Sequence, residues 1–215
     1  MSEVLHVERI RQILAQHGPV LLQVAAASIS HGLAQGTPLV VNKSEVDAEL
    51  TADGACFVTL KQDGALRGCV GSPRAHRPLI DDVAANAFAA AFADRRFPGL
   101  RAMERQDLDL SVTVLSAPQP IACTSEAALV AELRPHVDGL IIECGGRSAV
   151  FLPQVWAVLS APRLFLKELK AKAGLAVGYW SDDFRAWRFV AESVSSDALD
   201  DPDTLWHSAA DGSLY

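Results

Sequence analysis

The feature that most constrains the fold of this chain is a hairpin pattern near its middle. Ala55–Lys61 and Ala65–Val70 are rich in residues typical of strands, and Gln62-Asp63-Gly64 between them is typical of a tight turn. Loop length decides which side chains share a face, because a shift of one residue moves each to the other face. A two-residue loop would mix polar with apolar side chains. A three-residue loop places Leu60 opposite Leu66 and gives one apolar face, so we predict that loop.

Strand and helix patterns alternate along the rest of the chain without a strict βαβ rhythm. We expect helices over residues 4–16, 19–33, 79–93, 125–133 and 162–173, and further strands over residues 108–115, 139–144, 148–152 and 186–194. His17-Gly18-Pro19 is expected to separate the first two helices, because proline begins a helix more readily than it continues one. The lysines at 167, 170 and 172 are expected on the solvated face of the last helix. Hairpins dominate this order, so the sequence predicts an α+β fold.

Composition and charge exclude several classes of protein. Of 215 residues, 50% are hydrophobic and 21% are charged, as expected of a globular chain. The formal net charge of -7 argues against a general DNA-binding protein or a protein of acidic membrane surfaces, which need surplus Lys and Arg. The longest nearly apolar stretch, Val83–Ala93, is too short to span a bilayer, and the N-terminus lacks a cleavable signal pattern. We expect a cytoplasmic protein that binds neither DNA nor a membrane.

The spacing of cysteine and histidine predicts no metal and no cofactor. The four cysteines form no CxxC pair, and the six histidines form neither an HxH nor an HExxH pattern. A zinc site and a dense disulfide framework are therefore not indicated, and we expect reduced thiols.

The segment Leu66-Arg67-Gly68-Cys69-Val70-Gly71-Ser72 is the strongest candidate for chemistry. Arg67 and Cys69 are two residues apart in one strand and should share a face, where a guanidinium would stabilise the thiolate and activate it. Gly68 and Gly71 remove side-chain bulk beside the sulfur, so that a substrate or another backbone could approach closely. The alternative is that Cys69 is a small buried hydrophobic residue and that both glycines serve packing.

Arginines gather in the same part of the chain. Seven of them lie between residues 67 and 105, against four carboxylates, which gives this span a local net charge of +3. Arginine binds carboxylate and phosphate through two parallel hydrogen bonds, so we expect a small anionic ligand near Cys69, with Arg95 and Arg96 as binding residues. The alternative is a set of surface ion pairs, for example with Asp94.

The motifs, taken in order, resemble the AMMECR1 family. The matching blocks are Leu66–Ser72, Ala90–Phe97, Leu110–Leu115, Asp138–Ile142, Phe151–Val155, Phe165–Leu169 and Lys172–Leu175. The first block is highly specific, and the match covers roughly residues 18–194, which we expect to form an AMMECR1 domain. Residues 1–17 would then be an N-terminal helical extension. The chain departs from the family pattern at Arg95, where proline commonly follows the aspartate, and this change adds charge beside the candidate site.

The resemblance implies an α+β fold of two unequal lobes that share a core, each lobe a mainly antiparallel sheet with helices packed on it. The resemblance also implies partners: members of the family look like proteins that act together with Memo-like and radical-SAM proteins. Arguments for a site in this family point to the glycine-flanked cysteine, which here is Cys69 with Arg67.

Residues 195–215 form an acidic tail outside the match. They contain five aspartates and no Lys or Arg, so most of the net charge belongs to them. We expect a solvated extension, with an interaction role for Leu205 and Trp206 as the alternative.

Three classes of function stay open. The chain could be an enzyme or enzyme subunit that uses Cys69 as a nucleophile, with Arg67, Arg95 or Arg96 orienting a small anionic substrate. It could instead be a non-catalytic adaptor that acts with the Memo-like and radical-SAM proteins. An RNA-binding regulator is the third class and is disfavoured by the net charge.

Overall fold

The computed structural model describes residues 3–199 and 205–206, and the chain divides into two compact units. Unit 1 consists of residues 1–115 and 192–215, and unit 2 of residues 116–191. Each unit combines helices with an antiparallel sheet, which confirms the predicted α+β class. Of the acidic tail, only residues up to 199 and the pair Leu205–Trp206 are described; these two side chains are buried and not solvated.

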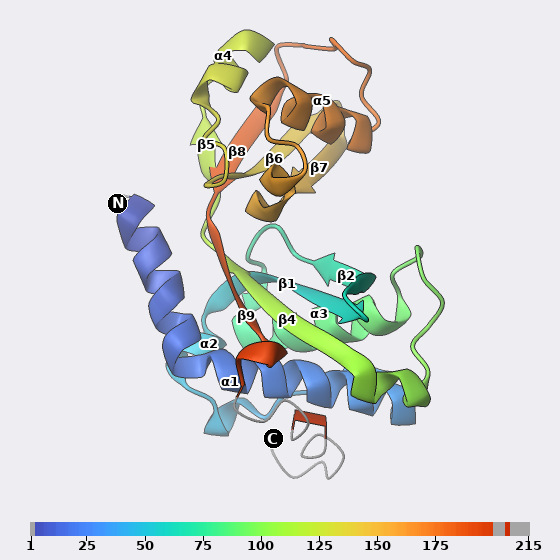
Figure 1. Cartoon of the computed structure of the whole chain (residues 1–215). Coiled ribbons are helices and arrows are strands. Elements are labelled where there is room, and N and C mark those ends of the chain that lie inside the picture. The colour runs from blue at the N-terminus through green and yellow to red at the C-terminus, as the bar shows by residue number, and fades with distance from the viewer. Residues whose placement is uncertain (1–2, 200–204, 207–215) are drawn as a thin grey trace. The chain divides into compact units, whose positions relative to one another are not determined.

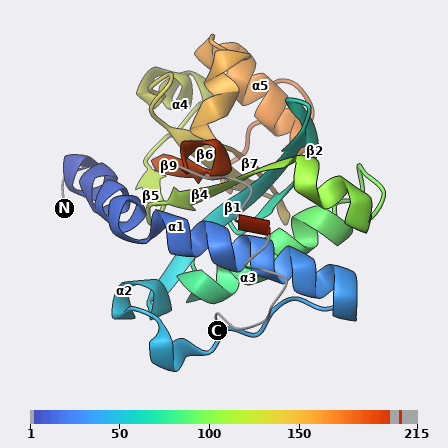
Figure 2. The ribbon, with the colours of Figure 1, turned by 60° about the horizontal axis from the view of Figure 1, so that its bottom comes forward.

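Unit 1 is a sheet with its long helices on one face (Figures 1 and 2). Its strands are β1 (Asp53–Gln62), β2 (Ala65–Gly71), β3 (Arg77–Pro78), β4 (Leu108–Leu115) and β9 (Ala191–Ser195). They run in the order β2-β1-β4-β9, and β3 pairs with β1. Its helices are α1 (Glu3–Gln35), α2 (Ala48–Thr51) and α3 (Leu79–Phe92), with the 3-10 turns η1 (Lys43–Glu45), η2 (Ala102–Asp107) and η4 (Ser196–Ala198). The sheet therefore has one face against helices and leaves β2 at an edge.

The two expected N-terminal helices are one continuous helix, α1, so the predicted break at residues 17–19 is wrong. Pro19 lies inside the helix, and the ribbon of α1 bends along its length (Figure 1), as expected where proline removes a backbone hydrogen bond. Tertiary packing outweighs that local cost, because Leu21, Leu22 and Ile29 are fully buried after the proline.

By length and composition alone, α1 could cross a bilayer, which the sequence analysis did not anticipate. Of an apolar window of 18 residues within this helix, 50% is buried inside the molecule. Packing against α3 and β4 accounts for its apolar face.

The hairpin of β1 and β2 has a two-residue turn, so the predicted three-residue loop is wrong. Gln62 pairs with Ala65, and both turn residues, Asp63 and Gly64, have positive φ angles of 52° and 74°. The alternation of faces is restored by a β-bulge. Lys61 pairs with Leu66 and Leu60 with Gly68, which leaves Arg67 as the extra residue of β2.

Unit 2 has its own sheet and its own hydrophobic core. Its elements are β5 (Gln119–Ile121), α4 (Glu126–Glu132), β6 (Gly139–Cys144), β7 (Arg147–Phe151), η3 (Pro153–Ala157), α5 (Pro162–Lys172) and β8 (Arg185–Phe189), with the sheet in the order β5-β8-β6-β7. In the core, the rings of Trp156 and Phe165 stack with centroids 3.7 Å apart, and both residues are fully buried. The single expected strand over residues 186–194 is two strands, β8 and β9, which belong to different sheets and meet near Val190.

Candidate functional site

The thiol of Cys69 lies on strand β2, directly across from Thr59 of strand β1. The Thr59 hydroxyl donates a hydrogen bond to Cys69 Sγ over 3.4 Å. Cys69 is half-buried and has a free thiol, whereas Cys56 and Cys144 are buried. Of these three thiols, Cys69 is the one that is partly accessible and also takes a hydrogen bond from a neighbouring strand.

The backbone of Cys69 is held from outside the sheet. Its amide donates to Asp94 Oδ2 over 2.9 Å, and its carbonyl accepts from the Arg96 guanidinium over 3.2 Å. Because β2 is an edge strand, these two groups would otherwise lack partners. The segment after α3 therefore caps the edge at the position of the cysteine, and this contact links two of the motifs found in the sequence.

Asp94 and Arg96 form a tight pair. Arg96 donates to the Asp94 carboxylate through Nε over 2.9 Å and through Nη2 over 2.6 Å. These bonds from Arg96, together with the amides of Cys69 and Arg96, hold the pKa of Asp94 far below its usual range, although burial acts to raise it. Asp94 is thus ionised at any pH near neutrality. Arg96 thus forms the surface ion pair that was the alternative to an anion-binding role. Even so, 56% of its side chain is exposed.

Arg67 does not contact the Cys69 thiol. Its Nε donates to Glu104 of η2 over 3.0 Å, and both side chains are nearly buried, with 10% and 12% exposed. The hydrogen bond from Arg67, followed by bonds from Arg101, lowers the pKa of Glu104 to about 2 against the effect of burial. The bulge interrupts the strict alternation that would have placed Arg67 and Cys69 together, so the structure pairs Arg67 with a carboxylate instead.

Gly68 and Gly71 lie beside protein atoms and not beside open space. A Cβ on Gly68 would lie 2.1 Å from the backbone oxygen of Ala90 in α3, and one on Gly71 would lie 2.2 Å from the Phe57 ring. The sequence left two alternatives for these glycines, the approach of a substrate and the approach of other protein groups. In the structure, other protein groups lie beside both glycines. Both glycines let β2 approach its neighbours.

Arg95 is the arginine that faces solvent beside this site. It is exposed and makes no hydrogen bond or ion pair within residues 3–199 and 205–206. Arg77 is paired with Asp82 and Arg101 with Glu104, whereas Arg105 donates a hydrogen bond to the Ser30 hydroxyl over 3.4 Å.

A small hollow on the same sheet is lined by residues of strands β1, β4 and β9. Ser111 of β4 pairs with Thr59 and lines the hollow, whose volume is about 80 Å³. Lys61, Asp109 and Asp197 supply its charged groups, so their net charge is -1 and does not favour an anion.

A buried polar network that was not predicted from the sequence surrounds Asp82. The Asp82 carboxylate is fully buried and accepts from the Cys56 amide, the Ser72 hydroxyl and the Arg77 guanidinium over 3.1, 2.7 and 2.8 Å. Asp82 raises the pKa of the Cys56 thiol, although burial is the larger cause. The signal in the sequence was Asp82 at a helical position between Leu79 and Val83, on the face that packs into the core.

The fold and the site together define a class: an α+β protein of two units, with a cysteine on an edge strand that an Asp–Arg pair caps. The AMMECR1 family model matches residues 22–194, so the chain belongs to the AMMECR1 family. The match begins close to the expected residue 18 and ends at the expected residue 194.

Individual relatives agree with this assignment. A protein of Methanothermobacter thermautotrophicus is 39% identical over 145 residues, which are 66% of this chain and 74% of that protein. Protein MK0488 of Methanopyrus kandleri is 29% identical over 200 residues, 89% of this chain and 94% of that protein. The crystal structure titled uncharacterized protein PH0010, from Pyrococcus horikoshii, has a TM-score of 0.77 and 32% sequence identity, and covers 84% of this chain and 91% of its own.

Proposed function

We propose that this AMMECR1 protein is an enzyme or enzyme subunit whose reactive group is the Cys69 thiol. The observation that carries the proposal is a set of three hydrogen bonds at one residue: Thr59 donates to the sulfur, while Asp94 and Arg96 fix the backbone. A reactive group works best on a rigid element whose position is held by its neighbours. Cys69 has this support and a half-buried side chain, which distinguishes it from the buried Cys56.

The substrate class that fits this site is a small anion. Arg95 and the exposed part of Arg96 follow α3 and lie next in sequence to the carboxylate that holds Cys69. Guanidinium groups there could bind a carboxylate or phosphate and orient it toward the thiol. Arg67 has no part in this step, because its charge is already matched by Glu104.

Memo-like and radical-SAM proteins are the partners that we propose, in the cytoplasm. This part of the proposal rests on the resemblance of the motifs to the family and on no contact in the structure. The protein would supply the thiol step within such a system.

The test is the rate of alkylation of each cysteine as a function of pH, measured by mass spectrometry on the folded protein. Cys56, Cys123 and Cys144 are internal controls. We expect Cys69 to react fastest at each pH, and Thr59→Val to slow it several-fold. Arg95→Gln should leave the intrinsic rate unchanged but weaken protection of Cys69 by added phosphate. If Cys69 reacts no faster than Cys123, the proposal is wrong.

A non-catalytic adaptor is the second candidate, and a specific observation favours it. The motif residues Arg67, Gly68 and Gly71 are all engaged in internal contacts. The motif would then specify a fold and a docking surface, and Cys69→Ser would fold normally and still bind its partners. An inert Cys69 thiol in the alkylation experiment would make this the leading function.

A further inference from the structure

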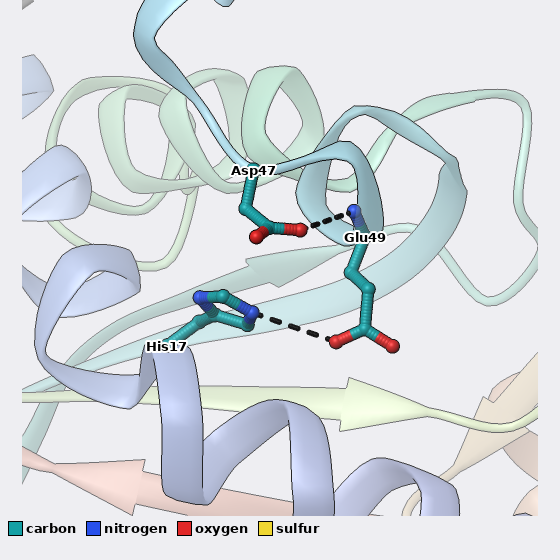
Figure 3. A group of neighbouring side chains, drawn as sticks. All are labelled: His17, Asp47 and Glu49. Carbon is teal, nitrogen blue, oxygen red and sulfur yellow. Dashed lines mark hydrogen bonds and ion pairs between the residues drawn. The ribbon is translucent and has the colours of Figure 1, made fainter.

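Three potential metal ligands meet between helix α1 and the start of helix α2 (Figure 3). They are His17, Asp47 and Glu49, and their ligand atoms all lie within 4.8 Å of one another. His17 Nε2 is 3.4 Å from Glu49 Oε2, and the His17 side chain is mostly buried, with 16% exposed. Residue 17 lies thirty positions from Asp47 in the sequence, so motif spacing could not reveal this group.

The charges at this group are not balanced by the protein. Within the part of the chain that the structure describes, neither Asp47 nor Glu49 pairs with a Lys or Arg, and His17 is the sole basic partner of Glu49. Two carboxylates this close repel one another unless a cation lies between them. Asp47 Oδ1 caps α2 through the Glu49 amide over 2.8 Å, while no hydrogen bond of Asp47 Oδ2 or Glu49 Oε1 occurs within the described residues.

The geometry points to a binding site for a divalent first-row transition metal ion of the Zn²⁺ type, held by His17, Asp47 and Glu49. Bonds of about 2.0–2.2 Å in a tetrahedral site place two ligand atoms about 3.3–3.6 Å apart, and the histidine–glutamate separation of 3.4 Å fits this. The Asp47 oxygen lies within 4.8 Å of the other two ligand atoms, and its side chain is exposed. An imidazole nitrogen in the set selects Zn²⁺ over Mg²⁺ or Ca²⁺, which prefer all-oxygen sites.

The site joins two elements that are distant in sequence. His17 lies in α1 just before Pro19, and the carboxylates lie at the start of α2, so the ion would fasten α2 to the long helix. Three protein ligands leave one tetrahedral position for water or another ligand. The family match begins at residue 22, so His17 lies outside it while Asp47 and Glu49 lie inside it.

The test is titration of the full-length, tag-free protein, stripped with a chelator, with Zn²⁺ and separately with Mg²⁺ in a calorimeter. We expect one Zn²⁺ per chain and at least tenfold weaker binding of Mg²⁺. His17→Gln, which can still donate to Glu49, and Asp47→Asn, which can still cap α2, should each weaken Zn²⁺ binding at least tenfold. His31→Gln, a substitution at another histidine of α1, is the matched control and should bind as the parent does.

A second readout excludes the cysteines as ligands. Co²⁺ in place of Zn²⁺ should give visible d–d absorption that His17→Gln removes, without the intense near-ultraviolet band of cobalt bound to thiolate. Circular dichroism of each variant verifies its fold. The inference is overturned if the parent protein binds no Zn²⁺, if His17→Gln binds as tightly as His31→Gln, or if the thiolate band appears.

Discussion

The charge state of a single residue in this chain depends on a partner from a distant segment. Glu104 is nearly buried, and Arg67 of strand β2 is the main cause of its lowered pKa of about 2. A carboxyl group whose pKa is lower in the folded than in the unfolded state stabilises the fold above its unfolded pKa, about 4.3. That stability is lost as the pH falls through the folded pKa.

Glu104→Gln should therefore destabilise the protein by about 3 kcal/mol at pH 7, because it leaves the nearly buried Arg67 without a counter-charge. The difference between parent and variant should shrink as the pH falls below about 4.3 and vanish below about pH 2, where the parent is protonated too. Urea unfolding at a series of pH values measures it. Glu168→Gln, at a residue whose side chain is 42% exposed, should change the free energy of unfolding by less than about 0.5 kcal/mol. A difference for Glu104→Gln that is independent of pH would contradict this account.

For single residues, the sequence predicts which residues are important better than it predicts which groups those residues contact. Cys69 was singled out from its motif, and it is the motif residue whose side chain takes a hydrogen bond from the neighbouring strand. Its supposed partner Arg67 was misplaced, because one bulge breaks the two-residue period on which the prediction rested. Asp94 and Arg96 could not be assigned to the backbone of Cys69, since that contact depends on where α3 ends in space.

Among the elements, strand β2 and helix α3 can lie close together because Gly68 has no side chain. Gly68→Ala would place a Cβ 2.1 Å from a backbone oxygen of α3, and a backbone atom cannot rotate away. We expect the midpoint of thermal unfolding to fall by at least about 2 °C, since overpacking costs roughly 1–3 kcal/mol. The matched control is Gly99→Ala, where the nearest atom is 4.0 Å away. Equal midpoints for the two variants would show that β2 and α3 can separate without loss.

The buried Lys170 of helix α5 forms an ion pair with Glu126 of helix α4. Helical periodicity had predicted that Lys170 lies on the solvent-exposed face of its helix. Lys170 is 1% exposed, and its Nζ lies 2.6 Å from Glu126 of α4. Glu126→Gln leaves that ammonium without a counter-charge and should cost about 2 kcal/mol in urea unfolding, whereas Glu126→Gln combined with Lys170→Met should recover most of the loss. No recovery in the double variant would mean that the lysine is held by packing and not by charge.

Other element predictions failed for the same kind of reason. Proline and glycine at residues 18–19 favoured a helix break locally, but the buried residues that follow keep α1 continuous. The pattern of residues 186–194 is that of a strand throughout. The position near Val190 where β8 gives way to β9 follows from the pairing of each half with a different sheet.

For the whole molecule, the decisive feature is that unit 2 is inserted into unit 1 with its two ends bonded together. The Ser116 amide donates to the Val190 carbonyl over 2.9 Å, and the Val190 amide donates to the Ser116 hydroxyl over 3.1 Å. The core of unit 2 is made of its own residues, among them the fully buried Leu140, Trp156 and Leu166. A unit with adjacent ends and a complete core has the properties of an independent domain.

Residues 116–191 expressed alone should therefore fold. We expect dispersed amide resonances in an NMR spectrum and one cooperative thermal transition, because a unit of this length can bury enough apolar surface without disulfides. Leu166→Asp places a charge in the core and should abolish the transition, whereas Leu164→Asp, at a residue 39% exposed, should keep it. If the parent fragment shows neither dispersion nor a transition, unit 2 needs unit 1 to fold, and its core alone does not define a domain.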